Sequence, residues 1–112
     1  MIDKKIVQLV SSLLSQTDAG NLNWEPAARD NWFQVFFLGY TIQLGETSDE
    51  YVLRMFDAHD RVLEEISTVS LRQQDINSMH KLERLHTEAR RKALGVEDAL
   101  DKILGALNKD KD

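Results

Sequence analysis

Hydrophobic residues at helical spacing open the chain. From about Asp3 to Asp18, polar residues such as Ser11 and Ser15 occupy the side opposite the apolar arc. The arc holds Ile2, Ile6, Leu9, Val10, Leu13 and Leu14. This pattern predicts an N-terminal helix within 1–18 that docks by one face, with Gly20 placed to end it.

The spacing then changes to two, which is typical of strands in a sheet with one buried face, over the block 32–67. A tight turn at Leu38 and Gly39 predicts three facing pairs, namely Phe37 with Tyr40, Val35 with Ile42 and Phe33 with Leu44. A second hairpin, turning at His59 and Asp60, would pair Leu53 with Ile66 and Arg54 with Glu65. That register sets Glu64 beside apolar residues, a conflict that a one-residue bulge at the turn would remove.

Two more amphipathic helices are predicted at 71–94 and 96–108, separated by Gly95. The first begins at Ser70, where Gln73 completes capping-box spacing, or a turn later near Asp75. The second has a strong apolar side and reads as another docking arm, followed by a tail at 109–112. Its apolar side holds Val96, Ala99, Leu100, Ile103, Leu104 and Leu107.

This order of patterns predicts an α+β fold in a single domain, 1–112. We expect an antiparallel sheet of about four strands, in two hairpins, packed on one face by the N-terminal helix and the two C-terminal helices. The segment 21–31 reads as a loop, in which Trp24 packs over the edge of the core rather than serving as a ligand platform.

Several stretches share these structural positions with a known group. They are Trp24 before the strands, the run Leu38 to Leu44, the hairpin from Asp57 to Asp60, and the run Ala89 to Leu100 followed by Ile103-Leu104. In them the chain resembles a group of short uncharacterised bacterial and phage-borne proteins. The resemblance implies the fold, and it implies no activity.

Composition and charge narrow the function classes. The net charge of −5 disfavours nucleic acid and anionic lipid, although basic residues gather between Leu71 and Ala93. The chain has no cysteine, which excludes disulfides and thiolate sites and suits the cytoplasm. No stretch approaches the ~18 apolar residues of a membrane span.

Residues suited to catalysis do not form a recognisable motif. His80, Glu83 and His86 follow at three-residue steps, but one helix cannot converge all three on a metal. We expect His86 to be a hydrogen-bonded core residue, and Asp57 and Asp60 to accept hydrogen bonds in a turn. The sequence therefore predicts no enzyme, no cofactor and no metal.

Interaction remains as the predicted function. If the helices cover one face of the sheet, Trp32, Phe36 and Phe56 are left on the other face as a candidate contact surface. The leading hypothesis is a non-enzymatic protein–protein interaction module, binding itself as a homodimer or another protein. One alternative is a small-ligand-binding or catalytic domain with a pocket between sheet and helices, using His86 and Tyr40. Another is an accessory factor such as an immunity protein or a chaperone.

Overall fold

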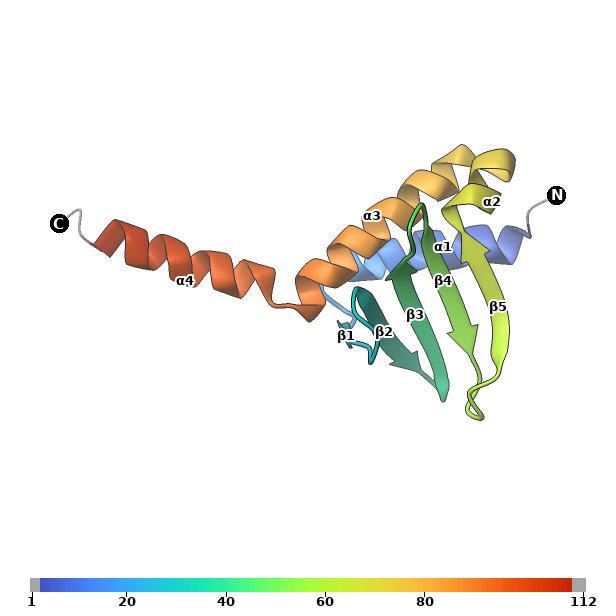
Figure 1. The fold of residues 1–112 in the computed structure, drawn as a ribbon, viewed down its shortest axis with the longest axis horizontal. Helices are drawn as coiled ribbons and strands as arrows, with labels where there is room; N and C mark the ends of the chain where they lie inside the picture. The colour runs from blue at the N-terminus through green and yellow to red at the C-terminus, as the bar shows by residue number, and fades with distance from the viewer. Residues whose placement is uncertain (1–2, 110–112) are drawn as a thin grey trace.

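The computed structural model describes residues 3–109, which form one antiparallel sheet and four helices (Figure 1). The predicted α+β fold class is confirmed. The elements in chain order are α1 (Lys4–Asp18), β1 (Glu25–Pro26), β2 (Trp32–Phe37), β3 (Tyr40–Glu46), β4 (Tyr51–Phe56), β5 (Val62–Ser67), α2 (Thr68–Gln74), α3 (Ile76–Ala93) and α4 (Val96–Asn108). The first two residues of the predicted helix and residues 110–112 of the predicted tail lie outside the described residues.

The sheet has five strands in chain order, each antiparallel to the next. The predicted pairs are present: Phe33 with Leu44, Val35 with Ile42, Phe37 with Tyr40, Leu53 with Ile66, and Arg54 with Glu65. The register shifts between Met55 and Phe56, as a bulge near the second turn requires. Glu64 still pairs with Met55, but its side chain is exposed. The fifth strand, β1, is only two residues long and pairs with β2.

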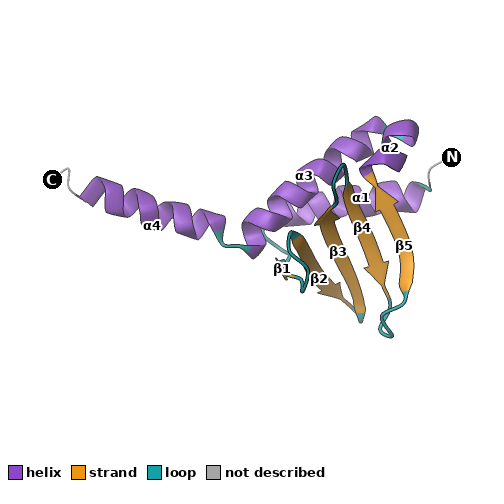
Figure 2. Cartoon of the chain, viewed as in Figure 1, coloured by secondary structure: helices purple, strands orange, loops and turns teal. Residues whose placement is uncertain are grey.

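The core lies on one face of the sheet, where α1 and α3 run side by side across the strands (Figure 2). Leu44 and Leu53 are fully buried beneath them, together with Leu82 and Leu85 of α3. Trp24 belongs to this core, as predicted. Its indole Nε1–H donates a hydrogen bond of 2.9 Å to the hydroxyl of Thr17, a buried residue of α1, so the loop before β1 is fixed to the helix layer.

The helix predicted over 71–94 is two helices in the structure. Ser67 is the N-cap of α2, where its side chain forms a capping box with Ser70, and Asp75 is the N-cap of α3. The carboxylate of Asp75 accepts hydrogen bonds from the backbone N–H groups of Asn77 and Ser78. Asp75 has an extended backbone, which interrupts the helix although the apolar spacing continues across it.

The last helix contradicts the expectation that both C-terminal helices pack on the sheet. α4 extends away from the body as an arm, and none of its residues is buried (Figure 1). The described chain is correspondingly elongated, measuring 60 × 32 × 27 Å. Gly95 sets this direction, because it joins α3 to α4 in the left-handed conformation with a φ of 64°. We refer to α4 as the arm.

Candidate interaction surfaces

The outer face of the sheet, opposite the helices, is crossed by a row of polar side chains. The row joins all five strands through Glu25, Gln34, Gln43, Arg54 and Glu65, which are successive cross-strand partners. Gln34 donates to Glu25 at 3.1 Å, Gln43 donates to Gln34 at 3.2 Å, and Arg54 pairs with Glu65 at 2.7 Å. This row divides the aromatic residues of the face into two separate groups.

Trp32 lies on the outer face as predicted, but its side chain is only 3% exposed. Its ring covers Gly45, its partner on β3, and the guanidinium groups of Arg29 and Arg54 lie over it at 5.4 and 4.9 Å from the centroid. Trp32 is therefore removed from the predicted contact surface. Its own neighbours cover it, because glycine on the adjacent strand leaves room for the ring.

The other two predicted contact residues sit at the opposite end of this face. Phe36 and Phe56 flank Thr41 in one cross-strand row, and Val62 follows Phe56 on the edge strand. Phe36 is 56% exposed and Phe56 is half-buried. They form a small apolar patch, and their role as a contact surface stays a prediction.

His86 is a buried core histidine, as expected from the sequence. Its ring stacks on Tyr51 at 4.6 Å between centroids, and its Nε2 lies 3.3 Å from the carbonyl oxygen of Asn31. Burial lowers the pKa of His86, against opposing contributions from the Asn31 carbonyl and the Glu46 carboxylate, with Arg90 adding to the lowering. A neutral His86 imidazole, with its Nε2–H donating to the Asn31 carbonyl oxygen, fits this buried position.

His86 and Tyr40, the residues of the alternative ligand-binding or catalytic pocket, do not lie together. Tyr40 begins β3, whereas Tyr51, which stacks on His86, pairs with Glu46 at the other end of that strand. Tyr40 lines a groove between α1 and the sheet, and His86 does not line it. The two residues therefore belong to opposite ends of the sheet.

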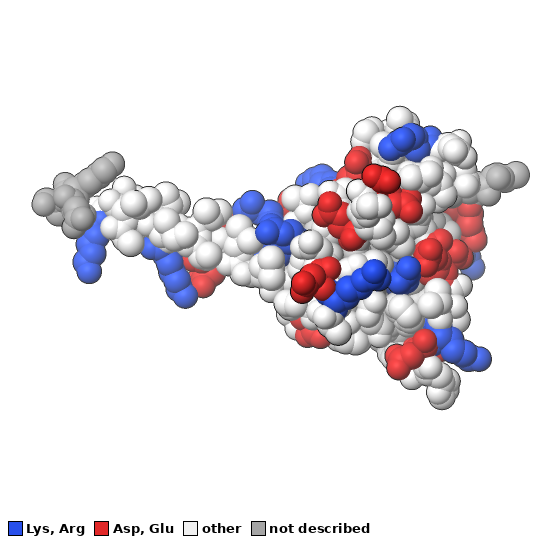
Figure 3. All heavy atoms as spheres, in the orientation of Figure 1, with Lys and Arg blue, Asp and Glu red and all other residues white. Residues whose placement is uncertain are grey.

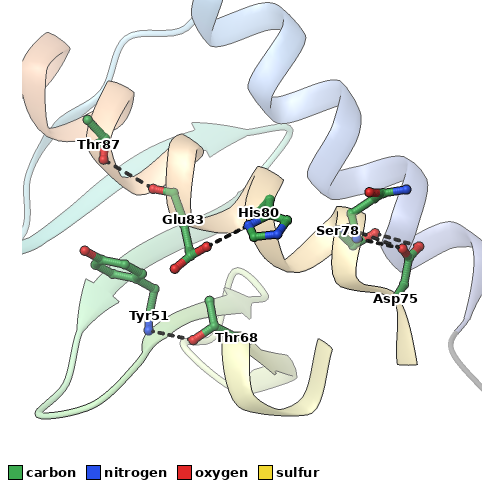
Figure 4. Close-up of polar contacts among 8 residues, drawn as sticks. Tyr51, Thr68, Asp75, Ser78, His80, Glu83 and Thr87 are labelled. Carbon is green, nitrogen blue, oxygen red and sulfur yellow. Dashed lines mark hydrogen bonds and ion pairs between the residues drawn. The ribbon is translucent and has the colours of Figure 1, made fainter. Parts of the chain in front are cut away.

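The remaining polar residues of α2 and α3 make local contacts. In Figure 4, His80 and Glu83 point toward each other along α3, with 3.2 Å between the imidazole Nδ1 and the carboxylate. The hydroxyl of Thr68 accepts a hydrogen bond from the backbone N–H of Tyr51, which ties α2 to β4. Within residues 3–109, no group of three or more histidine or acidic side chains converges on a point where a metal could bind.

Asp57 performs the turn role predicted for it. Its carboxylate accepts hydrogen bonds from the backbone N–H groups of Arg61 and His59 and pairs with the Arg61 side chain. The backbone hydrogen bond from Arg61 lowers the pKa of Asp57 most, and those from His59 and the Arg61 side chain add to this. The aspartate stabilises the β4–β5 turn.

An apolar groove lies between α1 and the end of the sheet that holds the β2–β3 turn. It has a volume of about 320 Å³ and its exposed surface is apolar. The lining residues are Leu9, Ser12, Leu13, Gln16, Leu22, Phe37, Tyr40, Ile42 and Met55. Burial falls along the inner face toward this groove: Leu44 is fully buried, Met55 is half-buried, and Tyr40 is 47% exposed. The turn end of the inner face is thus left uncovered by α1 and α3.

The second uncovered apolar surface is the arm. Leu100, Ile103, Leu104 and Leu107 are 41, 56, 53 and 66% exposed, and all lie on one side of α4. The visible face of the arm carries mostly uncharged side chains, with charges along one edge (Figure 3). Arg91 at the end of α3 pairs with Glu97 of the arm, which adds a contact across the Gly95 junction. The sequence showed the apolar side of this helix, but not that it would stay uncovered.

The chain was compared with protein families, curated proteins and solved structures. No family model, curated protein or solved structure matches the chain. None of the helices described between residues 3 and 109 combines the length and the apolar character needed to cross a membrane.

Proposed function

We propose that this protein is a non-enzymatic protein–protein interaction module that forms a homodimer, with the arm as its contact element. The observation that carries the proposal is the exposed apolar side of α4. Large contiguous apolar surfaces on small proteins mark interaction sites, because leaving them in water is unfavourable.

Helix physics supports the same proposal. Isolated helices of fewer than ~12–15 residues are marginal in water, and α4 has 13 residues with few contacts to the body. Packing its apolar side against a partner would supply the tertiary contacts that stabilise most helices. The polar side of the arm, with Glu97, Asp98 and Asp101 against Lys102, is a poor match for an anionic membrane.

Molar mass in solution tests this proposal. Light scattering coupled to gel filtration should give the mass of a dimer at micromolar concentration. Leu104→Asp, which places a charge on the apolar side of the arm, should shift the mass to that of a monomer. Gly105→Asp is the matched control: it adds the same charge one position along, where no atom lies within 4 Å of the added Cβ, and should leave the dimer intact.

Circular dichroism should show both variants folded, because neither residue is buried. A native chain that stays monomeric at every concentration would contradict the proposal. A dimer that survives Leu104→Asp would contradict the assignment of the arm as its contact element.

A second candidate function rests on the apolar groove. Its volume of about 320 Å³ lies at the lower end of small-ligand pockets, and its exposed surface is apolar. An apolar ligand of modest size, such as a medium-chain fatty acid, would suit it. Calorimetric titration with decanoate tests this function, and the absence of heat beyond dilution would contradict it.

A further inference from the structure

The chain carries two uncovered apolar surfaces, the arm and the groove between α1 and the sheet. We infer that the arm of one copy lies in the groove of a second copy, and that the second copy returns its arm to the first. This inference rests on the proposed homodimer and specifies how it is built. One chain supplies both complementary surfaces, so two copies related by a twofold axis occupy both grooves at once.

The arm does not occupy the groove of its own chain in this structure. It leaves the end of α3 and extends away from the body (Figure 1). The groove lies between α1 and the turn end of the inner sheet face. Within the described chain, no residue of α4 lines this groove.

The groove suits a helix because it continues the existing helix layer. α3 and α1 already lie side by side across the sheet, and a third helix beside α1 would cover Phe37, Tyr40 and Met55. Packed helices lie about 10 Å apart, so a helix packed beside α1 would lie over this part of the sheet. The arm presents aliphatic side chains at positions 96, 100, 103, 104 and 107, a stripe wide enough to contact both α1 and the sheet.

Interface area favours reciprocal exchange over pairing of the two arms with each other. A stable complex buries about 800 Å² on each partner. One side of the 13-residue arm offers on the order of half that area. In arm-to-arm pairing each copy contributes only this side, whereas in exchange each copy contributes its arm and its groove.

Charge at the edge of the groove is consistent with this arrangement. Lys5, Leu9, Ser12 and Gln16 follow at helical spacing on one side of α1, so the exposed Lys5 stands beyond the end of the groove. Among the described residues it forms no ion pair. The polar side of the arm carries acidic residues, Asp98 and Asp101 among them, that suit a lysine neighbour.

Cysteine cross-linking tests the inference cleanly, since the chain has no cysteine of its own. Ser12→Cys places a thiol at the groove, and Ile103→Cys places one at the middle of the apolar side of the arm. A mixture of the two single variants, treated with a short bismaleimide, should yield a cross-linked pair that neither variant forms alone. Cross-linking of Ile103→Cys with itself would overturn the inference in favour of arm-to-arm pairing. An intrachain link in the monomeric double variant would show that the arm folds onto its own groove.

A blocking substitution supplies a second, independent measurement. Ser12→Trp fills the groove from an exposed position, so the fold should be retained. It should raise the dimer dissociation constant by about tenfold or more. Ser15→Trp, also exposed on α1 but outside the groove, is the matched control and should leave the constant unchanged.

The two proposals fail in different ways. A native dimer that is lost in Leu104→Asp but retained in Ser12→Trp would overturn the exchange and leave the proposed function standing. A native monomer would overturn both.

Discussion

Trp32 and Gly45 face each other on neighbouring strands, and the indole ring occupies the space where any other side chain at position 45 would begin. A Cβ built on Gly45 would lie 1.9 Å from two ring atoms of Trp32. The arginines 29 and 54 cover the other side of the ring. The contact buries the largest aromatic side chain of the outer face without help from the helix layer.

Gly45→Ala should destabilise the protein by about 1–3 kcal/mol, because the ring of Trp32 must leave its position between Gly45 and the two arginines. Urea unfolding followed by tryptophan fluorescence measures the change. Gly105→Ala in the arm is the matched control, since nothing lies within 4 Å of its added Cβ and alanine favours a helix. Equal stability of Gly45→Ala and the native protein would show that the ring moves aside freely.

Thr17→Val should cost about 1–3 kcal/mol, although valine has nearly the same shape as threonine. The Thr17 hydroxyl accepts the hydrogen bond of the Trp24 indole inside the core, so its loss leaves a buried N–H without a partner. Unfolding in urea gives the free-energy change. Thr87→Val is the matched control, because the exposed Thr87 hydroxyl bonds only to a backbone carbonyl of its own helix. If Thr17→Val lowers the free energy of unfolding no more than Thr87→Val does, the Trp24–Thr17 hydrogen bond does not stabilise the core.

The free energy of unfolding should fall as the pH is lowered below about 6.5, the ordinary pKa of histidine. Burial lowers the pKa of His86 in the folded state, so the unfolded chain takes up a proton before the folded chain does. The contribution of His86 to the free energy of unfolding is complete above the pKa of His86 in the unfolded chain. It declines as the pH falls toward the pKa of His86 in the folded chain, and it levels off below that pKa. Urea titrations between pH 7.5 and 5 measure the slope.

His86→Gln should flatten this slope, even though it lowers the stability at every pH. His59→Gln, which removes an exposed imidazole in the β4–β5 turn, is the control and should retain the slope. Proton NMR of the imidazole gives the pKa directly. A value for His86 at or above 6.5 would contradict the assignment of burial as the dominant cause.

The sheet could be predicted in detail because alternation and turns fix its register. A slip of one residue would move Phe33, Val35 and Phe37 from the core face to the other face, so the apolar pattern alone selects the observed pairing. The core role of His86 was also predictable, because it lies at the edge of the apolar arc of its helix. These features depend on residues close in sequence or on one repeating pattern.

Other features depend on contacts that no local pattern reports. Trp32 reads as an exposed aromatic residue until Gly45 is placed opposite it, and β1 is too short to show an alternation. The apolar side of α4 predicts that the helix packs against another surface. The pattern is the same whether that surface is the chain's own sheet or a partner. The sequence therefore identified the arm as a docking element and placed it wrongly on its own body.

Phe36→Ala distinguishes the arm from the outer sheet face as the contact element. The side chain of Phe36 is 56% exposed at the end of the sheet beyond the polar row, so its loss should change stability by no more than about 0.5 kcal/mol. Since we assign the contact to the arm, light scattering should give the same dimer dissociation constant as for the native protein. Leu104→Asp, measured beside it, should give a monomer. Weakened association in Phe36→Ala with an unchanged fold would instead place Phe36 and Phe56 in the interface, and the arm would then need a different partner.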